Sequence, residues 1–233
     1  MDYFDFKQFR VYQDKSAFKV GTDGVLLGAW VNTALSKRIL DIGTGTGLIA
    51  LMMAQRSEAD IMAIEPDRHS YEQACENIER SPWKNKITVI NKAVQEFSPD
   101  INFDLIVTNP PFFRNSLPNN NERMTLARHD AGLPSNELLK AVVRLLSNKG
   151  RFSLILPYTE AAMFVAEATD FELFCNEILK VKPLPSAPVK RMLMEFSGEK
   201  GEMHQSFITV ESGKRHQYTA AYKKLTGDYY INF

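Results

Sequence analysis

The sequence contains few residues that form disulfide bridges or bind metals. Its two cysteines, Cys75 and Cys175, lie far apart, with no CxxC pair and no third cysteine, so neither a disulfide framework nor a zinc site is indicated. We expect both to be free thiols. His69, His204 and His216 show no ligand spacing with one another or with cysteine, and we therefore expect no metal ion.

Long hydrophobic runs are also absent. No apolar stretch approaches the roughly 20 residues that a membrane helix needs. The first residues, Met1–Asp5, do not show the basic region followed by an apolar one that marks a signal peptide. These absences predict a soluble, cytoplasmic protein that has no membrane partner, and no obligate protein partner is evident.

Neither sign of charge predominates, because 28 Lys and Arg residues balance 28 Asp and Glu residues. The net charge therefore does not favour nucleic-acid binding, for which a basic surface is the usual sign. The distribution is less even, since from Lys180 onward nine basic residues outnumber five acidic ones, a net charge of +4. Such a mild bias is as typical of a solvated surface as of a nucleic-acid-binding one.

The chain has 233 residues, 44% of them hydrophobic, which is enough for one sizeable core but too short for two ordinary domains and a linker. We expect a single domain, in which residues 1–36 precede a core of residues 37–233. Short β-branched runs alternate in this core with longer amphipathic segments. They predict strands at 38–42, 61–65, 87–90, 103–107 and 152–156, and helices at 48–55, 71–78, 138–146 and 161–168.

Strands that alternate with helices indicate an α/β fold of the Rossmann-like type, with a doubly wound, mainly parallel sheet. The helix at 138–146 is expected to close at Asn148–Gly150. Three further strands are predicted at 171–181, 192–196 and 206–210. Because no helix separates the last two, we expect a C-terminal antiparallel hairpin.

A glycine motif follows the strand predicted at 38–42. An open α/β sheet binds its ligands at the carboxyl ends of its strands, where this motif would lie. Gly43, Gly45 and Gly47 follow Asp41 with the spacing G-x-G-x-G. Dinucleotide binding needs G-x-G-x-x-G, but Leu48 stands at the position of the third glycine. Closely spaced glycines let the backbone approach an adenosyl and amino-acid group, because no Cβ intervenes. The alternative is a plain tight turn between a strand and a helix.

Glu65 ends the second strand, about twenty residues after the glycine motif, where a carboxylate can accept hydrogen bonds from both ribose hydroxyls of a nucleoside. An ordinary capping acid before Pro66-Asp67 is the alternative. The position of Glu65 at the end of a predicted strand favours the nucleoside-binding role.

A second motif, Asn109-Pro110-Pro111-Phe112, follows the strand at 103–107. The Asn109 side-chain oxygen and the Pro110 carbonyl can each accept an N–H from an amine or amide, and so hold its nitrogen in a near-attack geometry. Two successive prolines stiffen the loop, and Phe112 can stack on a planar substrate. A strand-ending turn with a buried Phe is the alternative. The two motifs together predict methyl transfer onto nitrogen, with these four residues as the catalytic set and no required general base.

These residues resemble a known family. Asp41–Gly47 and Asn109–Phe112 are similar to motifs I and IV of the class I S-adenosylmethionine-dependent amino methyltransferases. The resemblance continues over nearly the whole chain to the bacterial tRNA1(Val) (adenine(37)-N6)-methyltransferase family, through the segments Phe6–Phe9, Gln13-Asp14, Ala17–Trp30 and Ala127–Leu139. It implies methyl transfer from S-adenosyl-L-methionine to N6 of adenine 37 in the anticodon loop of tRNA1(Val).

The resemblance also implies a cofactor site, and it makes residues 1–36 a cofactor-capping segment. Such enzymes often place an acidic residue against the adenine amino group, but Ala93 occupies that place here, so the backbone N–H of Val94 is the remaining candidate. Thr22-Asp23 also fits a plain helix cap, and Lys19 a surface charge. The implied cofactor-binding residues are Lys19, Gly21, Thr22, Asp23, Asp41, Gly43, Gly45, Gly47, Glu65, Val94 and Asn109.

Basic residues near the second motif are candidates for binding tRNA around a flipped-out base. Charges on loops are also commonly just solvated, so both interpretations stay open. The RNA-binding candidates are Arg114, Arg123, Arg128 and His129, beside the loop after Phe112, and Lys190-Arg191 after a proline-rich run.

Other functions share parts of this pattern. Glutamine-N5 protein methyltransferases have a similar Asn-Pro-Pro clamp but carry an extra N-terminal domain, and guanine-N2 rRNA methyltransferases share Asn-Pro-Pro-Phe. A non-enzymatic RNA-binding domain would lack the constellation of glycines, Glu65 and Asn109 that is present here. A restriction-type DNA methyltransferase would need a target-recognition domain that this length hardly permits.

Overall fold

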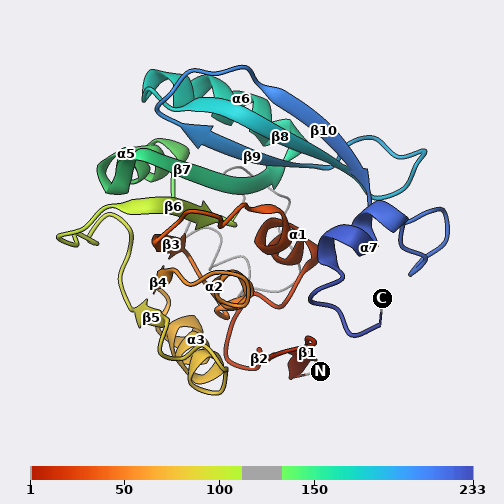
Figure 1. The fold of residues 1–233 in the computed structure, drawn as a ribbon, viewed down its shortest axis with the longest axis horizontal. Helices are drawn as coiled ribbons and strands as arrows, with labels where there is room; N and C mark the ends of the chain where they lie inside the picture. Colours follow the sequence, from red (N-terminus) through yellow and green to blue (C-terminus); the bar gives the residue numbers. More distant parts are fainter. Residues whose placement is uncertain (1, 112–132, 233) are drawn as a thin grey trace.

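The computed structural model describes residues 2–111 and 133–232. The strands in this part of the chain are β1 (Tyr3–Asp5), β2 (Arg10–Tyr12), β3 (Arg38–Ile42), β4 (Asp60–Ile64), β5 (Ile87–Ile90), β6 (Phe103–Thr108), β7 (Leu146–Pro157), β8 (Phe174–Lys182), β9 (Arg191–Ser197) and β10 (His204–Thr209). The helices are α1 (Thr22–Trp30), α2 (Leu48–Ala54), α3 (Arg68–Glu79), α5 (Ser135–Leu145), α6 (Tyr158–Asp170) and α7 (Ala220–Thr226) (Figure 1).

A sheet of eight strands forms the centre of the described chain, in the order β10-β8-β9-β7-β6-β3-β4-β5. From β7 to β5 all pairings are parallel, as expected for a doubly wound fold. β3 lies between β4 and β6, so the strand order reverses beside β3. In open α/β sheets the ligand crevice lies at such a reversal, outside the carboxyl ends of the strands.

The C-terminal strands pair differently from the expectation. An antiparallel hairpin is present, but β8 and β9 form it. The last two strands, β9 and β10, do not pair with each other, because both edges of β9 are already occupied by β7 and β8. β10 instead lies parallel to β8 at the edge of the sheet.

The expected end of the helix before β7 was also wrong. α5 ends at Leu145 and β7 begins at once, so Asn148–Gly150 belong to a strand and not to a turn. Gly150 lies where the register between β6 and β7 shifts, and a Cβ there would come within 2.9 Å of the Phe103 carbonyl oxygen. The glycine therefore permits a close approach of two strands.

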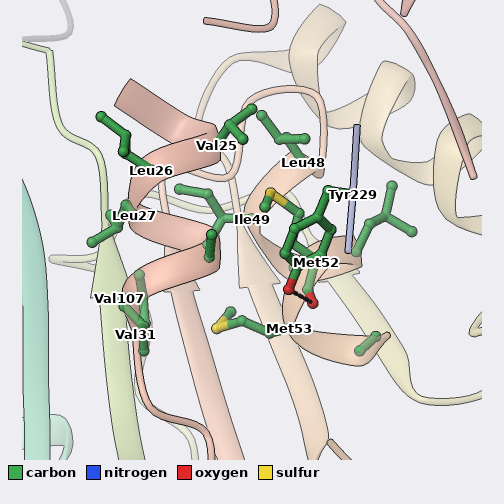
Figure 2. Close-up of a cluster of buried hydrophobic side chains, with 14 of the residues drawn as sticks. Val25, Leu26, Leu27, Val31, Leu48, Ile49, Met52, Met53, Val107 and Tyr229 are labelled. Carbon is green, nitrogen blue, oxygen red and sulfur yellow. Dashed lines mark hydrogen bonds between the residues drawn. The ribbon is translucent and has the colours of Figure 1, made fainter. Parts of the chain in front are cut away.

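Two hydrophobic clusters cover the two faces of the sheet. On one face, Leu138, Leu139 and Phe164 of α5 and α6 pack against Phe152 and Phe196 of the sheet. On the other face, α1 and α2 pack together with residues of the C-terminal segment (Figure 2). Their contact is so close that a Cβ at Gly28 would lie 2.7 Å from the Met52 sulfur.

The N-terminal hairpin β1–β2 and the C-terminal segment with α7 pack on this second face, although they come from opposite ends of the chain. The Lys7 N–H donates to the Tyr229 carbonyl at 2.8 Å, and Phe6 forms an isolated bridge with Tyr230.

Cys75 and Cys175 are both free thiols. None of the helices in the described part of the chain combines the length and the apolar character required to cross a bilayer.

Candidate active site

The glycine motif forms the turn between β3 and α2. Gly43, Gly45 and Gly47 have φ angles of +69°, +58° and +82°, a region that costs residues with a Cβ about 1–2 kcal/mol. Nothing lies within 4 Å of the places where Cβ atoms of Gly43 and Gly45 would be, so this side of the loop is open. Gly47 faces the other way, against Ala74 and Ile78 of α3.

Glu65 connects this loop with the turn that begins α3. Its Oε2 accepts a hydrogen bond from the Gly45 N–H at 2.8 Å, and its Oε1 accepts one from the Asp67 N–H at 3.0 Å. Burial raises the pKa of Glu65, although these two amides act in the opposite direction. Asp67, and not Glu65, caps α3, because it accepts from the Ser70 N–H at 2.7 Å. Each Glu65 oxygen keeps a further lone pair for a ligand.

Asp41 is fully buried beneath the glycine loop. Its Oδ2 accepts a hydrogen bond from the Thr44 hydroxyl at 2.6 Å, whereas no described residue donates to its Oδ1 within hydrogen-bonding distance. Burial raises the pKa of the carboxyl to about 7, against the lowering effect of the Thr44 hydroxyl and the Ala50 amide. An unsatisfied buried carboxylate oxygen is costly, so it fits a site that receives a polar or cationic group.

Asn109-Pro110-Pro111 lies next to the glycine loop, because β6 and β3 are neighbours in matched register. Thr108 pairs with Ile42, and its hydroxyl donates to the Ile42 carbonyl at 2.8 Å. The two loops therefore leave the sheet side by side and at the same level. Asn109 is half-buried, and Pro110 is buried. Phe112, the last residue of the motif, lies outside the described residues.

The segment before α1 reaches the site through two buried polar residues of α3. Asn77 donates to the carbonyls of both Thr46 and Tyr12 at 2.8 Å, and it accepts from the Tyr12 N–H. Gln73 accepts from the Lys15 N–H at 2.9 Å. These bonds hold the N-terminal segment beside the glycine loop.

α1 begins where this segment ends. Gly21 occupies the N-cap position of α1 and Thr22 is its first residue, so the helix has no side-chain cap and the alternative interpretation of Thr22-Asp23 as a helix cap was wrong. Lys19, Gly21 and Thr22 are exposed, and Asp23 is half-buried. A Cβ at Gly24 would lie 3.1 Å from Leu48 and 3.9 Å from the Asn109 side-chain nitrogen. The first turn of α1 is thus a wall of the same crevice.

Val94 lies in the turn after β5. Its side chain is buried, and its carbonyl accepts from the Arg144 guanidinium at 2.9 Å. The Asn91 side chain in the same turn donates to the Glu65 carbonyl at 2.8 Å, which fixes this turn beside the end of β4. A backbone group presented by this turn is therefore rigidly placed.

The candidate RNA-binding residues separate into two groups. Arg114, Arg123, Arg128 and His129 lie outside the described residues. Lys190 is exposed, and Arg191 forms an ion pair with Asp23 at 2.7 Å, where β9 begins.

The sequence analysis did not identify some of the residues that shape the site. Asn77 and Gln73 are polar residues, four apart, on the buried face of α3, and such buried polar pairs usually have specific partners. Thr44, which bonds to Asp41, stands inside the glycine motif itself. The Asp23–Arg191 pair has no local signal, because its members are 168 residues apart.

The solved structures that this chain matches in fold include methyltransferases. A predicted O-methyltransferase from Agrobacterium tumefaciens matches with a TM-score of 0.70 and 20% identity, over 89% of this chain and 96% of that one. A ribosomal protein L11 methylase from Lactobacillus delbrueckii subsp. bulgaricus matches with a TM-score of 0.56 and 15% identity, over 82% and 83% of the two chains. The family model described as the methyltransferase small domain matches residues 11–155. The family model, together with the fold, thus places the chain among the S-adenosylmethionine-dependent methyltransferases.

Curated relatives narrow this class to one family. Proteins named tRNA1(Val) (adenine(37)-N6)-methyltransferase from Trichodesmium erythraeum and Flavobacterium psychrophilum are each 46% identical to this chain, over 99% and 98% of its length and 98% and 99% of their own. One of the same name from Bacteroides thetaiotaomicron is 43% identical over 99% of this chain and 98% of its own. The chain belongs to the tRNA1(Val) (adenine(37)-N6)-methyltransferase family.

Proposed function

We propose that this chain transfers a methyl group from S-adenosyl-L-methionine to N6 of adenine 37 in tRNA1(Val). The observation that carries the proposal is the adjacency of the two motifs: the glycine loop and Asn109-Pro110 leave neighbouring, register-matched strands at the point where the strand order reverses. The near full-length similarity to enzymes of that name supports the substrate. The proposal includes a cytoplasmic location, which follows from a tRNA substrate.

The residues present fit the cofactor. The open side of Gly43 and Gly45 leaves room for a ligand against the backbone, and the buried Asp41 Oδ1 lacks a donor within the described chain. Glu65 would hold the ribose hydroxyls with its remaining lone pairs, and the turn at Val94 would meet the adenine. Lys19 and Gly21–Asp23 would close the methionine end. When bound, S-adenosylmethionine supplies an electrophilic methyl group on a positively charged sulfur.

Asn109 and Pro110 would hold the nucleophile. The N6 amine of adenine is a poor nucleophile, because its lone pair is delocalised into the ring. The Asn109 side-chain oxygen and the Pro110 carbonyl would each accept one N–H, which localises the lone pair and aims it at the methyl group. That pair would form the new N–C bond as the bond between sulfur and the methyl carbon breaks and leaves its electrons on the sulfur, and one proton would then pass from N6 to water. A side-chain base is not required, since the proton becomes acidic once the bond forms.

Labelled methyl transfer tests the substrate. Unmodified valine tRNA transcripts, incubated with the full chain and labelled S-adenosylmethionine and then digested to nucleosides, should yield N6-methyladenosine. A transcript in which adenine 37 is replaced by guanine should yield none. Label in a release-factor protein, or N2-methylguanosine in added rRNA, would assign the enzyme to a different acceptor and overturn the proposal.

Replacement of Asn109 tests the clamp. Asn109→Ala should lower kcat by about a hundredfold or more, since misplaced reacting groups lose that much, and leave S-adenosylmethionine binding close to that of the unchanged chain. Asn85→Ala is a matched control, because Asn85 is exposed in the turn before β5. This turn lies at the amino ends of the parallel strands, whereas Asn109 lies at their carboxyl ends. Full activity in the Asn109→Ala variant would exclude the clamp.

A further inference from the structure

The sheet contributes one charged side chain to the first turn of α1. Arg191 Nε donates to Asp23 Oδ2 at 2.7 Å, and the two side chains are only 30% and 25% exposed. For comparison, Arg10 and Asp5 in the N-terminal hairpin form an ion pair whose members are 43% and 39% exposed. A pair that is partly withdrawn from water is screened less and contributes more to local geometry.

Arg191 is a rigid anchor for this contact. It is the first residue of β9, and it pairs with Pro157 of β7 on one side and Val181 of β8 on the other. The preceding residue, Lys190, is bonded on both sides too, donating to Val181 and accepting from Tyr158. The guanidinium thus projects from a backbone that is fixed by two neighbouring strands.

The first turn of α1 is packed on its core side, where Gly24 and Val25 are buried, but its N-terminus has no side-chain cap. Its N-cap, Gly21, has no side chain to close the helix end. Asp23 lies near the positive end of the helix dipole, which favours its charge but does not fix its direction. The adjacent Gly24 lies against Leu48 and Asn109. A shift of this turn therefore moves a wall that both the glycine loop and the clamp share.

We infer that Arg191 is a positioning residue that acts through Asp23: it holds the first turn of α1 in register with the glycine loop and Asn109, and so prepares the site for S-adenosylmethionine. The inference rests on the proposed function, in which Asp23 closes the methionine end of the cofactor. It assigns Arg191 a role inside the protein, in place of the contact with RNA phosphate that its position after the proline-rich run first indicated.

Binding of S-adenosylmethionine to the full chain, measured by calorimetry without tRNA, tests this role. Arg191→Ala should weaken binding by about tenfold, the size of effect that loss of a charged hydrogen bond carries. Arg191→Lys keeps the charge and should restore most of the affinity. Asp23→Asn combined with Arg191→Ala should be no weaker than the weaker single variant, because both remove the same interaction. Arg10→Ala is the matched control, since it breaks an Arg–Asp pair in the hairpin instead.

The salt dependence of tRNA binding separates this role from the RNA contact. With positioning, Arg191→Ala leaves the slope of log K against log salt unchanged, whereas loss of one phosphate contact reduces it by about 1. Unchanged S-adenosylmethionine affinity in Arg191→Ala, with or without a reduced slope, would overturn the inference, and so would additive effects in the double variant. A chain that binds S-adenosylmethionine but methylates no tRNA would refute the proposed function alone.

Discussion

At the scale of single residues, Asp41 makes stability depend on pH. Burial raises its pKa from 3.8 to about 7, so the folded chain holds this proton more tightly than the unfolded chain. The contribution of Asp41 to the free energy of unfolding therefore falls by about 4 kcal/mol at most as pH rises from about 4 to about 7. Above pH 7 the contribution stays constant. Chemical denaturation at several pH values measures this.

Asp41→Asn isolates the effect from other carboxyls whose pKa is raised, such as Glu65. The stability of this variant relative to the unchanged chain should increase between about pH 4 and 7, because only the aspartate loses its proton there. Asp60→Asn, at the exposed start of β4, is the charge control. A difference between Asp41→Asn and the unchanged chain that does not vary with pH would contradict the buried-carboxyl argument.

Gly45 combines a left-handed backbone with a hydrogen bond to Glu65. Gly45→Ala should destabilise the fold by about 1 kcal/mol, because its φ of +58° is unfavourable for a residue with a Cβ, although space is available. Thermal unfolding measures the loss. Gly198→Ala is the control, since Gly198 has neither a left-handed φ nor a close neighbour. Equal melting temperatures for the two variants would exclude backbone strain as the cause.

At the scale of elements, the C-terminal segment completes α2. The Tyr229 hydroxyl donates to the Met52 carbonyl at 3.1 Å, near the end of α2, where helix carbonyls lack intrahelical partners (Figure 2). Tyr229→Phe should lower the free energy of unfolding by about 1 kcal/mol, because it removes one buried hydrogen bond and keeps the ring. Tyr158→Phe is the control, as Tyr158 is 49% exposed. Denaturant titration that gives both variants the same stability would argue against this cap.

The strands beside the site were predicted from local patterns, but the way they pair was only partly predicted. The buried parallel strand β3 appears as a short apolar run, and the edge strand β5 appears as a β-branched run, so both were predicted with their actual bounds. The partner of β10 depends on which edge is free once β7, β8 and β9 have assembled, and no local pattern encodes that. The short β1–β2 hairpin and α7 were missed for a related reason, since they are stabilised by contacts between the two ends of the chain.

At the scale of the whole molecule, one part of the site was predictable from the sequence and another part was not. The glycine loop, Glu65 and Asn109 each follow a strand, so motif spacing and fold class together predicted that they would meet at one edge of the sheet. The Asp23–Arg191 pair joins segments 168 residues apart, and only the assembled sheet brings them together. Motifs thus predicted the groups proposed to touch the ligands, but not the contacts that position them.

Because the charge of the whole chain is balanced, we expect tRNA binding to depend on a few local cations. Lys190 is exposed at the edge of the sheet where Asn109 lies, and its backbone is fixed by bonds to Val181 and Tyr158. Lys190→Ala should weaken tRNA binding and reduce the salt slope of log K by about 1, as loss of one phosphate contact does. Filter binding across a salt series measures both.

Lys149→Ala removes the same charge from the first part of β7, near the amino ends of the parallel strands and away from Asn109. It should change neither the affinity for tRNA nor the salt slope. S-adenosylmethionine affinity should be unaffected in both variants, because neither side chain lies in the proposed cofactor site. If Lys190→Ala and Lys149→Ala reduce the salt slope equally, tRNA is attracted by the field of the whole chain and not by a contact at this edge. If only Lys190→Ala does, the anticodon arm docks at the start of β9, which lies two strands from the β6 end that carries the clamp.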